Sequence, residues 1–204
     1  MFFKFPDILK KFYPDAIWTL PSESENVKDV YLTFDDGPTK GVTDWVLDLL
    51  MKHGVKATFF CLGKNIETNP DLLRRISAEG HTAANHTFNH LNGWKNSTQK
   101  YLYDISLCEK FALKNYFRPP YGKLSPMQYL KLKKKYKIIF WDLLSYDFQN
   151  TVSPSVSIEK IKQYSRNGSI IVFHDSLKAE KNLKLILPGV LNYLKAEGFS
   201  FRAM

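Results

Sequence analysis

Two adjacent carboxylates, Asp35 and Asp36, directly follow an apolar stretch at residues 30–34 and precede Gly-Pro at 37–38. The β-branched and aromatic residues of this stretch favour a strand, and Gly-Pro ends it. Both acids are therefore expected at a strand end, where side chains can converge on a cleft. Because neighbouring strand residues point to opposite faces, one carboxylate could hold a cation while the other accepts a proton. Asp-Gly is also a common turn signal, so the pair alone is equally consistent with two solvated acids.

Two histidines four residues apart, His86 and His90, are the next candidates. The Asn and Gly residues around them lack apolar helical periodicity, so the pair is expected on a loop or short turn. Two imidazoles and one carboxylate on one side of a cation leave positions open for water and substrate. This donor set is typical of catalytic zinc and also of non-haem iron, and the spacing alone does not choose between them.

A third histidine, His174, follows the apolar residues 170–173. Asp147 is available to orient one of its ring nitrogens, and a histidine held by a carboxylate is a good general acid. A partly buried structural histidine would show the same pattern.

Arg118 precedes two prolines, which fix the backbone that follows. The N–H of Tyr121 could then be aimed as an oxyanion donor, although a surface salt bridge would also account for Arg118. Large side chains near these positions could wall an apolar pocket or belong to the core. The residues expected in the substrate pocket are Pro120, Trp141, Phe148 and Phe173.

The elements that must position these residues alternate between strands and helices. Strands are expected at residues 30–34, 56–62, 82–84, 137–144, 169–173 and 199–202, and helices at 43–53, 70–79, 98–115, 125–136, 158–166 and 180–197, the last kinked or split at Pro188. Asn69 is expected to cap the helix that begins at Pro70. The alternation predicts a parallel sheet in a β/α architecture. The candidate residues all follow strands, and a β/α barrel builds its active site from those loops, which favours the functional interpretation.

Length and composition restrict the class of protein. A chain of 204 residues with 44% hydrophobic residues is expected to be one domain, here residues 27–204. Residues 1–26 are expected to pack on it through aromatic side chains, namely Phe2, Phe3, Phe5, Phe12, Tyr13 and Trp18. The net charge of +9 includes a basic run at 131–137, which is expected to be a solvated helix face because no nucleic-acid motif accompanies it.

The remaining compositional features concern location. Cys61 and Cys108 lack CxxC spacing and are expected to be buried free thiols of a reducing compartment; a disulfide between them is the alternative that the sequence leaves open. No apolar run has the length of a membrane span or a signal-peptide core. The expectation is a monomer in the cytoplasm, or in the cell envelope if a leader was removed.

Five ordered motifs resemble the polysaccharide deacetylases, a family also called the NodB-homology domain or carbohydrate esterase family 4. They are Thr33-Phe-Asp-Asp-Gly37, His86-Thr-x-x-His90, Arg118-Pro-Pro-Tyr121, residues 141–148, and Val172-Phe-His174. The resemblance runs from about residue 29 to the C-terminal helix. This chain has Val172 where the family usually has Leu, and Phe148 where it usually has Trp. Both changes keep an apolar wall and alter the shape of the pocket more than its chemistry.

The resemblance implies a distorted (β/α) barrel and metal-dependent removal of N-acetyl groups from N-acetylglucosamine-containing glycans of the chitooligosaccharide or peptidoglycan type. It implies Zn²⁺, or another divalent transition metal such as Co²⁺, bound by Asp36, His86 and His90. It also implies that Asp35 is the general base, His174 the general acid tuned by Asp147, Arg118 the residue that holds the base, and the Tyr121 N–H the oxyanion donor. Asp142 is the alternative partner of His174.

Two other functions stay open. A carbohydrate-binding domain could keep the motifs without turnover. A 2-His-1-carboxylate iron enzyme would use Asp36, His86 and His90 but would need neither Asp35 nor His174. A nucleic-acid partner is not expected, since only the net charge would favour it.

Overall fold

The computed structural model describes residues 3–4, 10–22, 24 and 26–204. The strands in this part of the chain form one parallel sheet with the order β5-β4-β3-β2-β1-β7-β6, and β8 pairs with the first half of β1. Their bounds are β1 Lys28–Asp35, β2 Thr58–Cys61, β3 Thr82–Asn85, β4 Lys114–Phe117, β5 Lys137–Ile138, β6 Leu143–Leu144, β7 Ser169–His174 and β8 Phe199–Phe201.

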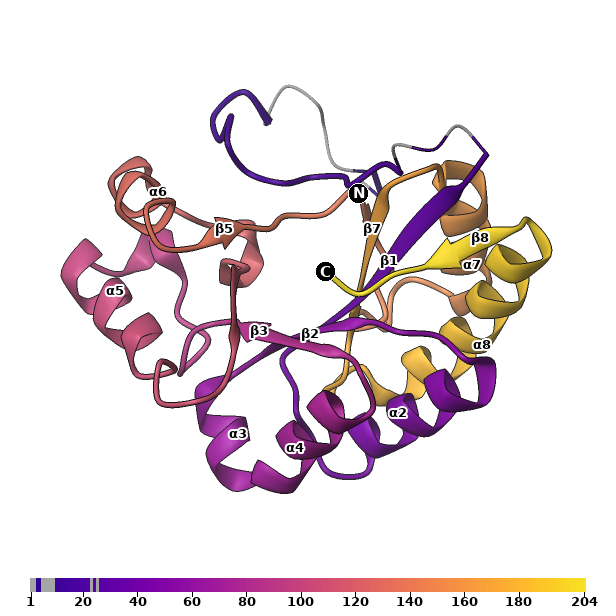
Figure 1. Ribbon diagram of the computed structural model, residues 1–204, viewed down its shortest axis with the longest axis horizontal. Helices are drawn as coiled ribbons and strands as arrows, with labels where there is room; N and C mark the ends of the chain where they lie inside the picture. Colours follow the sequence, from indigo (N-terminus) through magenta and orange to yellow (C-terminus); the bar gives the residue numbers. More distant parts are fainter. Residues whose placement is uncertain (1–2, 5–9, 23, 25) are drawn as a thin grey trace.

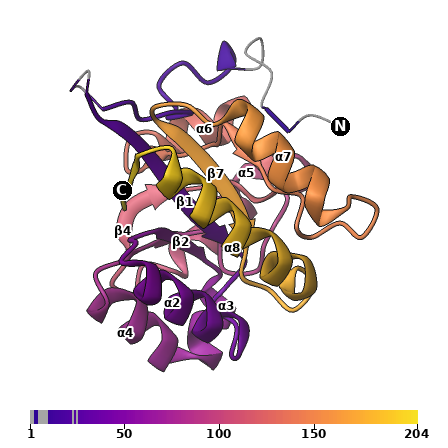
Figure 2. The ribbon, with the colours of Figure 1, turned by 90° about the vertical axis from the view of Figure 1, so that its right-hand side faces the viewer.

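Helices lie around the outside of the curved sheet (Figures 1 and 2). Their bounds are α2 Val42–His53, α3 Gly63–Thr68, α4 Pro70–Ala78, α5 Thr98–Ser106, α6 Pro126–Leu132, α7 Pro154–Tyr164 and α8 Glu180–Ala196, with short 3₁₀ turns η1 Gly93–Lys95 and η2 Pro120–Gly122. The main apolar core fills the space between the central strands and α2 and α8, where Phe34 stacks on Phe59 and on Phe173.

Residues 139–142 join the two edges of the sheet. The N–H of Ile139 donates to Phe117 O at the end of β4, and the N–H of Asp142 donates to Ile170 O of β7. Four residues span at most about 14 Å, so the edge strands β5 and β6 are brought close together. The sheet therefore curls into an incomplete barrel, which confirms the predicted distorted (β/α) barrel.

Several predicted elements were wrong in detail. The strand predicted at 137–144 is two short strands on opposite edges, because the chain crosses the barrel between them. The helix predicted at 98–115 ends at Ser106, and β4 was not predicted because only Phe117 of this short strand is buried, which leaves no alternating pattern. The helix α3 was also missed, since Gly63 was interpreted as a strand end rather than a helix start.

Two helix predictions also need correction. Helix α8 continues through Pro188, so it is not split there, and buried leucine and valine side chains pack it on the apolar core; a kink at this proline stays a prediction. Asn69 stands at the N-cap position of α4, but its side chain does not cap that helix. Its Nδ2 instead donates to Pro38 O at 3.2 Å and ties α4 to the loop after β1.

The described part of residues 1–26 contacts the link between the sheet edges. Trp18 is buried and stacks on Phe140 with ring centroids 4.2 Å apart, and Tyr13 packs edge-on against Tyr129. Phe12 is 70% exposed, so the prediction that it contributes to this packing was wrong. Phe2 and Phe5 lie outside the described residues. The division of the chain at residue 26 stays a prediction.

Three compositional expectations can be compared with the structure. Cys61 and Cys108 are free and buried, as predicted. The side chains of the basic run at 131–137 include Lys133 and Lys135, which form ion pairs with Asp15 and Glu109. Among the described residues, no helix combines the length and the apolar character needed to cross a bilayer.

Candidate active site

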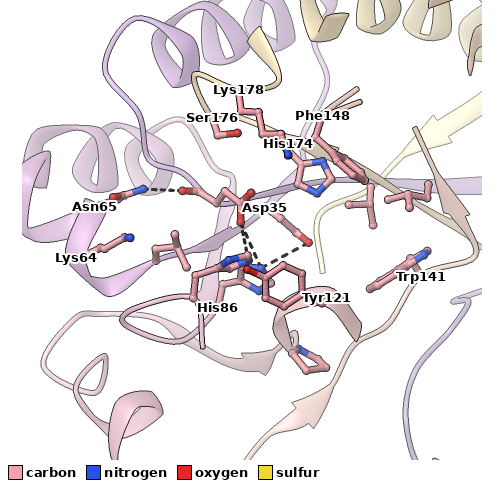
Figure 3. Close-up of a pocket in the computed structure, with 16 residues that line it drawn as sticks. Asp35, Lys64, Asn65, His86, Tyr121, Trp141, Phe148, His174, Ser176 and Lys178 are labelled. Atoms are coloured by element: carbon pink, nitrogen blue, oxygen red, sulfur yellow. Dashed lines mark hydrogen bonds and ion pairs between the residues drawn. The ribbon is translucent and has the colours of Figure 1, made fainter. Parts of the chain in front are cut away.

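One cleft brings together most of the polar residues that the sequence places after strands (Figure 3). It has a volume of about 620 Å³ and opens at the carboxyl ends of β1, β3 and β7. Its acids and histidines are Asp35, Asp36, His86, His90 and His174; its apolar and aromatic walls are Leu62, Pro119, Tyr121, Trp141, Leu144, Phe148 and Val172; Lys64, Asn65, Ser176 and Lys178 complete the lining.

Two of the predicted pocket residues do not line this cleft. Phe173 is fully buried against Phe34, because successive residues of β7 face opposite sides of the sheet and Val172 takes the cleft side. Pro120 is buried behind the surface, and its neighbour Pro119 forms the wall. Trp141 and Phe148 line the cleft, where the sequence placed them.

Arg118 is completely buried and links β4 to β1 through the centre of the barrel. Its Nη1 donates to Asp35 Oδ1 and to Thr33 Oγ1, both at 2.7 Å. The other nitrogens donate to the carbonyl oxygens of Ile139 and Phe140, which belong to the link between the sheet edges. Burial lowers the pKa of Arg118, and the charge of Asp35 opposes this effect. The surface salt bridge considered from the sequence is therefore excluded.

Asp35 and Asp36 face the same cleft, contrary to the prediction that they point to opposite faces. Asp35 ends β1, whereas Asp36 has a φ of 77° and has left the strand. This left-handed turn brings Oδ1 of Asp36 to 3.6 Å and Oδ2 of Asp35 to 4.0 Å from the same atom, His86 Nε2. The alternation rule fails here because it applies only while the backbone remains extended.

Three side chains form a cluster of possible metal ligands, Asp36, His86 and His90. One ligand atom from each lies within 4.8 Å of the others, and Nε2 of His90 is 3.1 Å from Asp36 Oδ1. Burial alone would raise the pKa of Asp36, but the close contact with His90 and the charges of the surrounding histidines hold this pKa well below its usual value. Asp36 is therefore a carboxylate at any physiological pH.

The protonation of His86 indicates that this cluster suits a cation. Its Nδ1 lies 2.8 Å from Arg118 O, which can only accept, and burial lowers the pKa of His86 to about 4. The neutral ring therefore carries its proton on Nδ1 and presents a lone pair at Nε2. This lone pair and the Asp36 carboxylate are two acceptors facing one another, an arrangement that a divalent cation between them would stabilise. Two nitrogens and one oxygen are suitable ligands for Zn²⁺.

His174 is paired with Asp147 and not with Asp142. Its Nδ1 is 2.8 Å from Asp147 Oδ1, and its backbone N–H donates to Oδ2 at 2.7 Å. Asp142 instead accepts hydrogen bonds from Arg166 and Ser169, outside the cleft. Burial alone would lower the pKa of His174, but the charge and hydrogen bond of Asp147, together with the other nearby carboxylates, raise it to about 9. At neutral pH His174 is a charged proton donor at the wall of the cleft.

Tyr121 has a backbone conformation that few residues adopt. Its φ is 61°, between Pro120 and Gly122 in η2. Its ring lines the cleft and lies 4.6 Å from the His90 ring. The Tyr121 N–H donates to no acceptor among the described residues, so it is available to an oxyanion.

Sequence reasoning missed a buried carboxylate behind the cleft, Asp175. Its Oδ1 accepts the N–H of Gly37 at 3.0 Å and its Oδ2 accepts the hydroxyl of Thr43 at 2.5 Å. Burial raises the pKa of Asp175 to about 7. A Cβ at Gly37 would lie 2.0 Å from Asp175 Oδ2, so only glycine fits there. Its position directly after His174 at a strand end was the signal that could have identified it.

Comparison with known proteins identifies the class to which this fold and cleft belong. The family model for polysaccharide deacetylase matches residues 22–138. The crystal structure of the Bc1960 peptidoglycan N-acetylglucosamine deacetylase superimposes with a TM-score of 0.85 at 30% identity, covering 98% of this chain and 95% of that one. The chain belongs to the polysaccharide deacetylase family, as the five motifs predicted.

Relatives at the sequence level carry related names. A peptidoglycan-N-acetylglucosamine deacetylase of Bacillus cereus is 32% identical over 90% of this chain and 88% of its own length. A chitooligosaccharide deacetylase of Rhizobium leguminosarum bv. trifolii is 29% identical over 87% of this chain and 90% of its own length. A third relative, the peptidoglycan-N-acetylglucosamine deacetylase PgdA of Listeria monocytogenes, is 33% identical over 94% of this chain, which spans 41% of that protein.

Proposed function

We propose that this protein is a metal-dependent deacetylase that hydrolyses N-acetyl groups of N-acetylglucosamine-containing glycans. The observation that carries the proposal is that three groups with different chemistry line one cleft. The base is Asp35, paired with Arg118. The cation site is the cluster of Asp36, His86 and His90. The acid is His174, paired with Asp147. An iron oxygenase would leave the Arg118–Asp35 pair and the Asp147–His174 pair without a role.

In the proposed mechanism each group has one task. A divalent cation such as Zn²⁺, bound by Asp36, His86 and His90, would polarise the acetyl carbonyl and make water more acidic. Asp35, oriented by Arg118, accepts the proton of the attacking water. The Tyr121 N–H donates to the oxyanion that develops on the carbonyl oxygen. Asp147 holds the His174 imidazolium, which gives its Nε2 proton to the amide nitrogen as the C–N bond breaks, so that acetate and the amine leave and His174 becomes neutral.

The walls of the cleft suit a sugar ring. Trp141, Tyr121 and Phe148 line the cleft with aromatic rings, and Phe148 makes a T-shaped contact with His174, with ring centroids 4.8 Å apart. The relatives' names point to chitooligosaccharide or peptidoglycan as the glycan. Either offers the pyranose and N-acetyl group that this site would bind.

Acetate release tests the proposal. Purified protein should release acetate from chitooligosaccharides or peptidoglycan fragments, lose this activity with a chelator, and regain it with Zn²⁺ or Co²⁺. A chelator should remove activity because the cluster supplies three ligands and leaves the rest of the coordination sphere open. Glycan binding without acetate release from any of these substrates would instead support a carbohydrate-binding domain, and oxygen uptake dependent on Fe²⁺ would support the iron enzyme.

The acid role of His174 predicts a pH profile. Its pKa is raised to about 9, so the protonated form needed for catalysis is present below this pH and is lost above it. Asp147→Asn removes the charge that raises the pKa most, so the alkaline limb of kcat against pH should move to lower pH. Profiles of both proteins should be measured with the same metal, because a bound cation lowers the pKa of His174 in each. An alkaline limb that does not move would argue against His174 as the acid.

A further inference from the structure

A buried carboxylate outside the cleft, Asp104, holds the loop that joins the two histidines. Asp104 lies on α5 and is 4% exposed. Its Oδ2 accepts the backbone N–H groups of Phe88 at 2.9 Å and Asn89 at 3.0 Å, and its Oδ1 accepts Nδ2 of Asn89 at 2.6 Å. Hydrogen bonds to a carboxylate are stronger than neutral ones. One side chain therefore binds both amides at the centre of the loop.

The backbone of this loop requires external support. Thr87 has a φ of 69° and His90 a φ of 59°, both in the left-handed region that side chains disfavour. Such conformations persist only where the surrounding structure determines them. The two residues that Asp104 binds lie directly between these two strained positions.

The start of α3 holds the opposite side of the loop. The N–H of Gly63 donates to Thr87 O at 3.0 Å and the N–H of Lys64 to Phe88 O at 3.2 Å. The Phe88 ring lies so close to Gly63 that a Cβ there would be 2.3 Å from Cδ2 of that ring. The start of α3 thus binds the carbonyl groups of the loop, and Asp104 binds its amide groups. Loss of either set of hydrogen bonds would let the loop move.

The two histidines depend on this loop to different degrees. His86 has anchors of its own, because its N–H donates to Cys61 O and its Nδ1 contacts Arg118 O. No hydrogen bond to His90 Nδ1 is found among the described residues. Its ring contacts the rings of Tyr121 and His86, and its Nε2 lies 3.1 Å from Asp36 Oδ1, so outside the ligand cluster the described residues that place it are those of the loop and Tyr121. The direction of His90 Nε2 therefore follows the backbone that Asp104 fixes.

We propose that Asp104 is a positioning residue that sets the metal affinity of the cleft by fixing the loop that carries His90. The inference rests on the proposed function, since it takes His90 as a metal ligand. It concerns the placement of His90 and gives Asp104 no contact with metal or substrate.

The test compares the binding of Zn²⁺ alone to metal-free full-length variants, by competition with a chromophoric chelator. Asp104→Asn should weaken binding by about 10–100-fold, the usual effect of losing a partner that orients a ligand. An amide at this position can still accept from the loop, but it lacks the negative charge that strengthens the hydrogen bonds from the N–H groups of Phe88 and Asn89. The absorption spectrum of bound Co²⁺ should change as well, because it reports the geometry around the metal.

Asp142→Asn is the matched control. Asp142 is also a fully buried carboxylate with side-chain partners, Arg166 and Ser169, but it lies outside the cleft. Its variant should lose stability and keep the wild-type affinity for Zn²⁺. If D104N does not fold, Asn89→Ala takes its place and should weaken Zn²⁺ binding severalfold, since it removes one of the three bonds.

Each outcome decides the proposal. Wild-type affinity in D104N, or in N89A if D104N is unfolded, would overturn it while leaving the proposed function intact. An equal loss of affinity in D142N would also overturn it, because the effect would then be one of general stability. A wild-type protein that neither binds Zn²⁺ nor releases acetate would refute the proposed function, and the role of Asp104 with it.

Discussion

Asp35→Asn is expected to reduce deacetylation by about 10²–10⁴-fold, the usual contribution of a general base. The amide has nearly the same shape as the carboxylate and its oxygen can still accept from Arg118 Nη1, but the buried Arg118 cation loses its counter-ion, so the variant should be less stable than the wild type. It cannot accept a proton from water at neutral pH. The measurement is kcat/KM for acetate release from a defined N-acetylated oligosaccharide, with Zn²⁺ at saturation.

Zn²⁺ affinity separates this role from metal binding. Asp35 is not part of the ligand cluster, so its variant should bind Zn²⁺ within a few-fold of wild type. Asp36→Asn is the matched control at the neighbouring position, and it should lose both metal and activity. The assigned roles would be wrong if D35N retained wild-type turnover, or if D36N bound Zn²⁺ normally.

The parts of the site that could be predicted lie in short segments next to strands. Asp35 and Asp36 directly follow an apolar stretch, and His86 and His90 are four residues apart. The members of each pair must therefore lie close together in space, whatever the rest of the fold. The rule that β/α folds collect loops at the carboxyl ends of strands then brings these segments together without any knowledge of the contacts.

The parts that could not be predicted depend on tertiary contacts. A surface salt bridge was an alternative for Arg118, because its carbonyl partners belong to a link between sheet edges that has no sequence signature. Asp104 resembles any acid on a helix until the loop after β3 is placed against it. Phe173 was assigned to the pocket because both faces of β7 are buried and carry apolar residues. The sequence therefore does not show which face turns to the cleft and which turns to the core.

The largest effect on stability is expected from Arg118→Met. Arg118 is buried completely, donates to Asp35, Thr33, Ile139 and Phe140, and lies with Cζ 4.0 Å from the centroid of the Phe60 ring. Its removal leaves the Asp35 carboxylate buried without a cation. Breaking a buried ion pair in this way costs about 3–5 kcal/mol, which is a large fraction of the stability of a single domain. Urea unfolding of the variant and the wild type measures the difference.

A double-mutant cycle identifies the origin of this loss. If the stranded charge of Asp35 dominates, D35N/R118M should be less destabilised than the sum of the single variants, because the amide needs no cation. Additive effects would place the loss in the freed carbonyl groups of Ile139 and Phe140 and in the cavity beside Phe60. A loss below about 1 kcal/mol, the range of exposed pairs, would contradict the prediction that this buried pair is a large contribution to the stability of the fold.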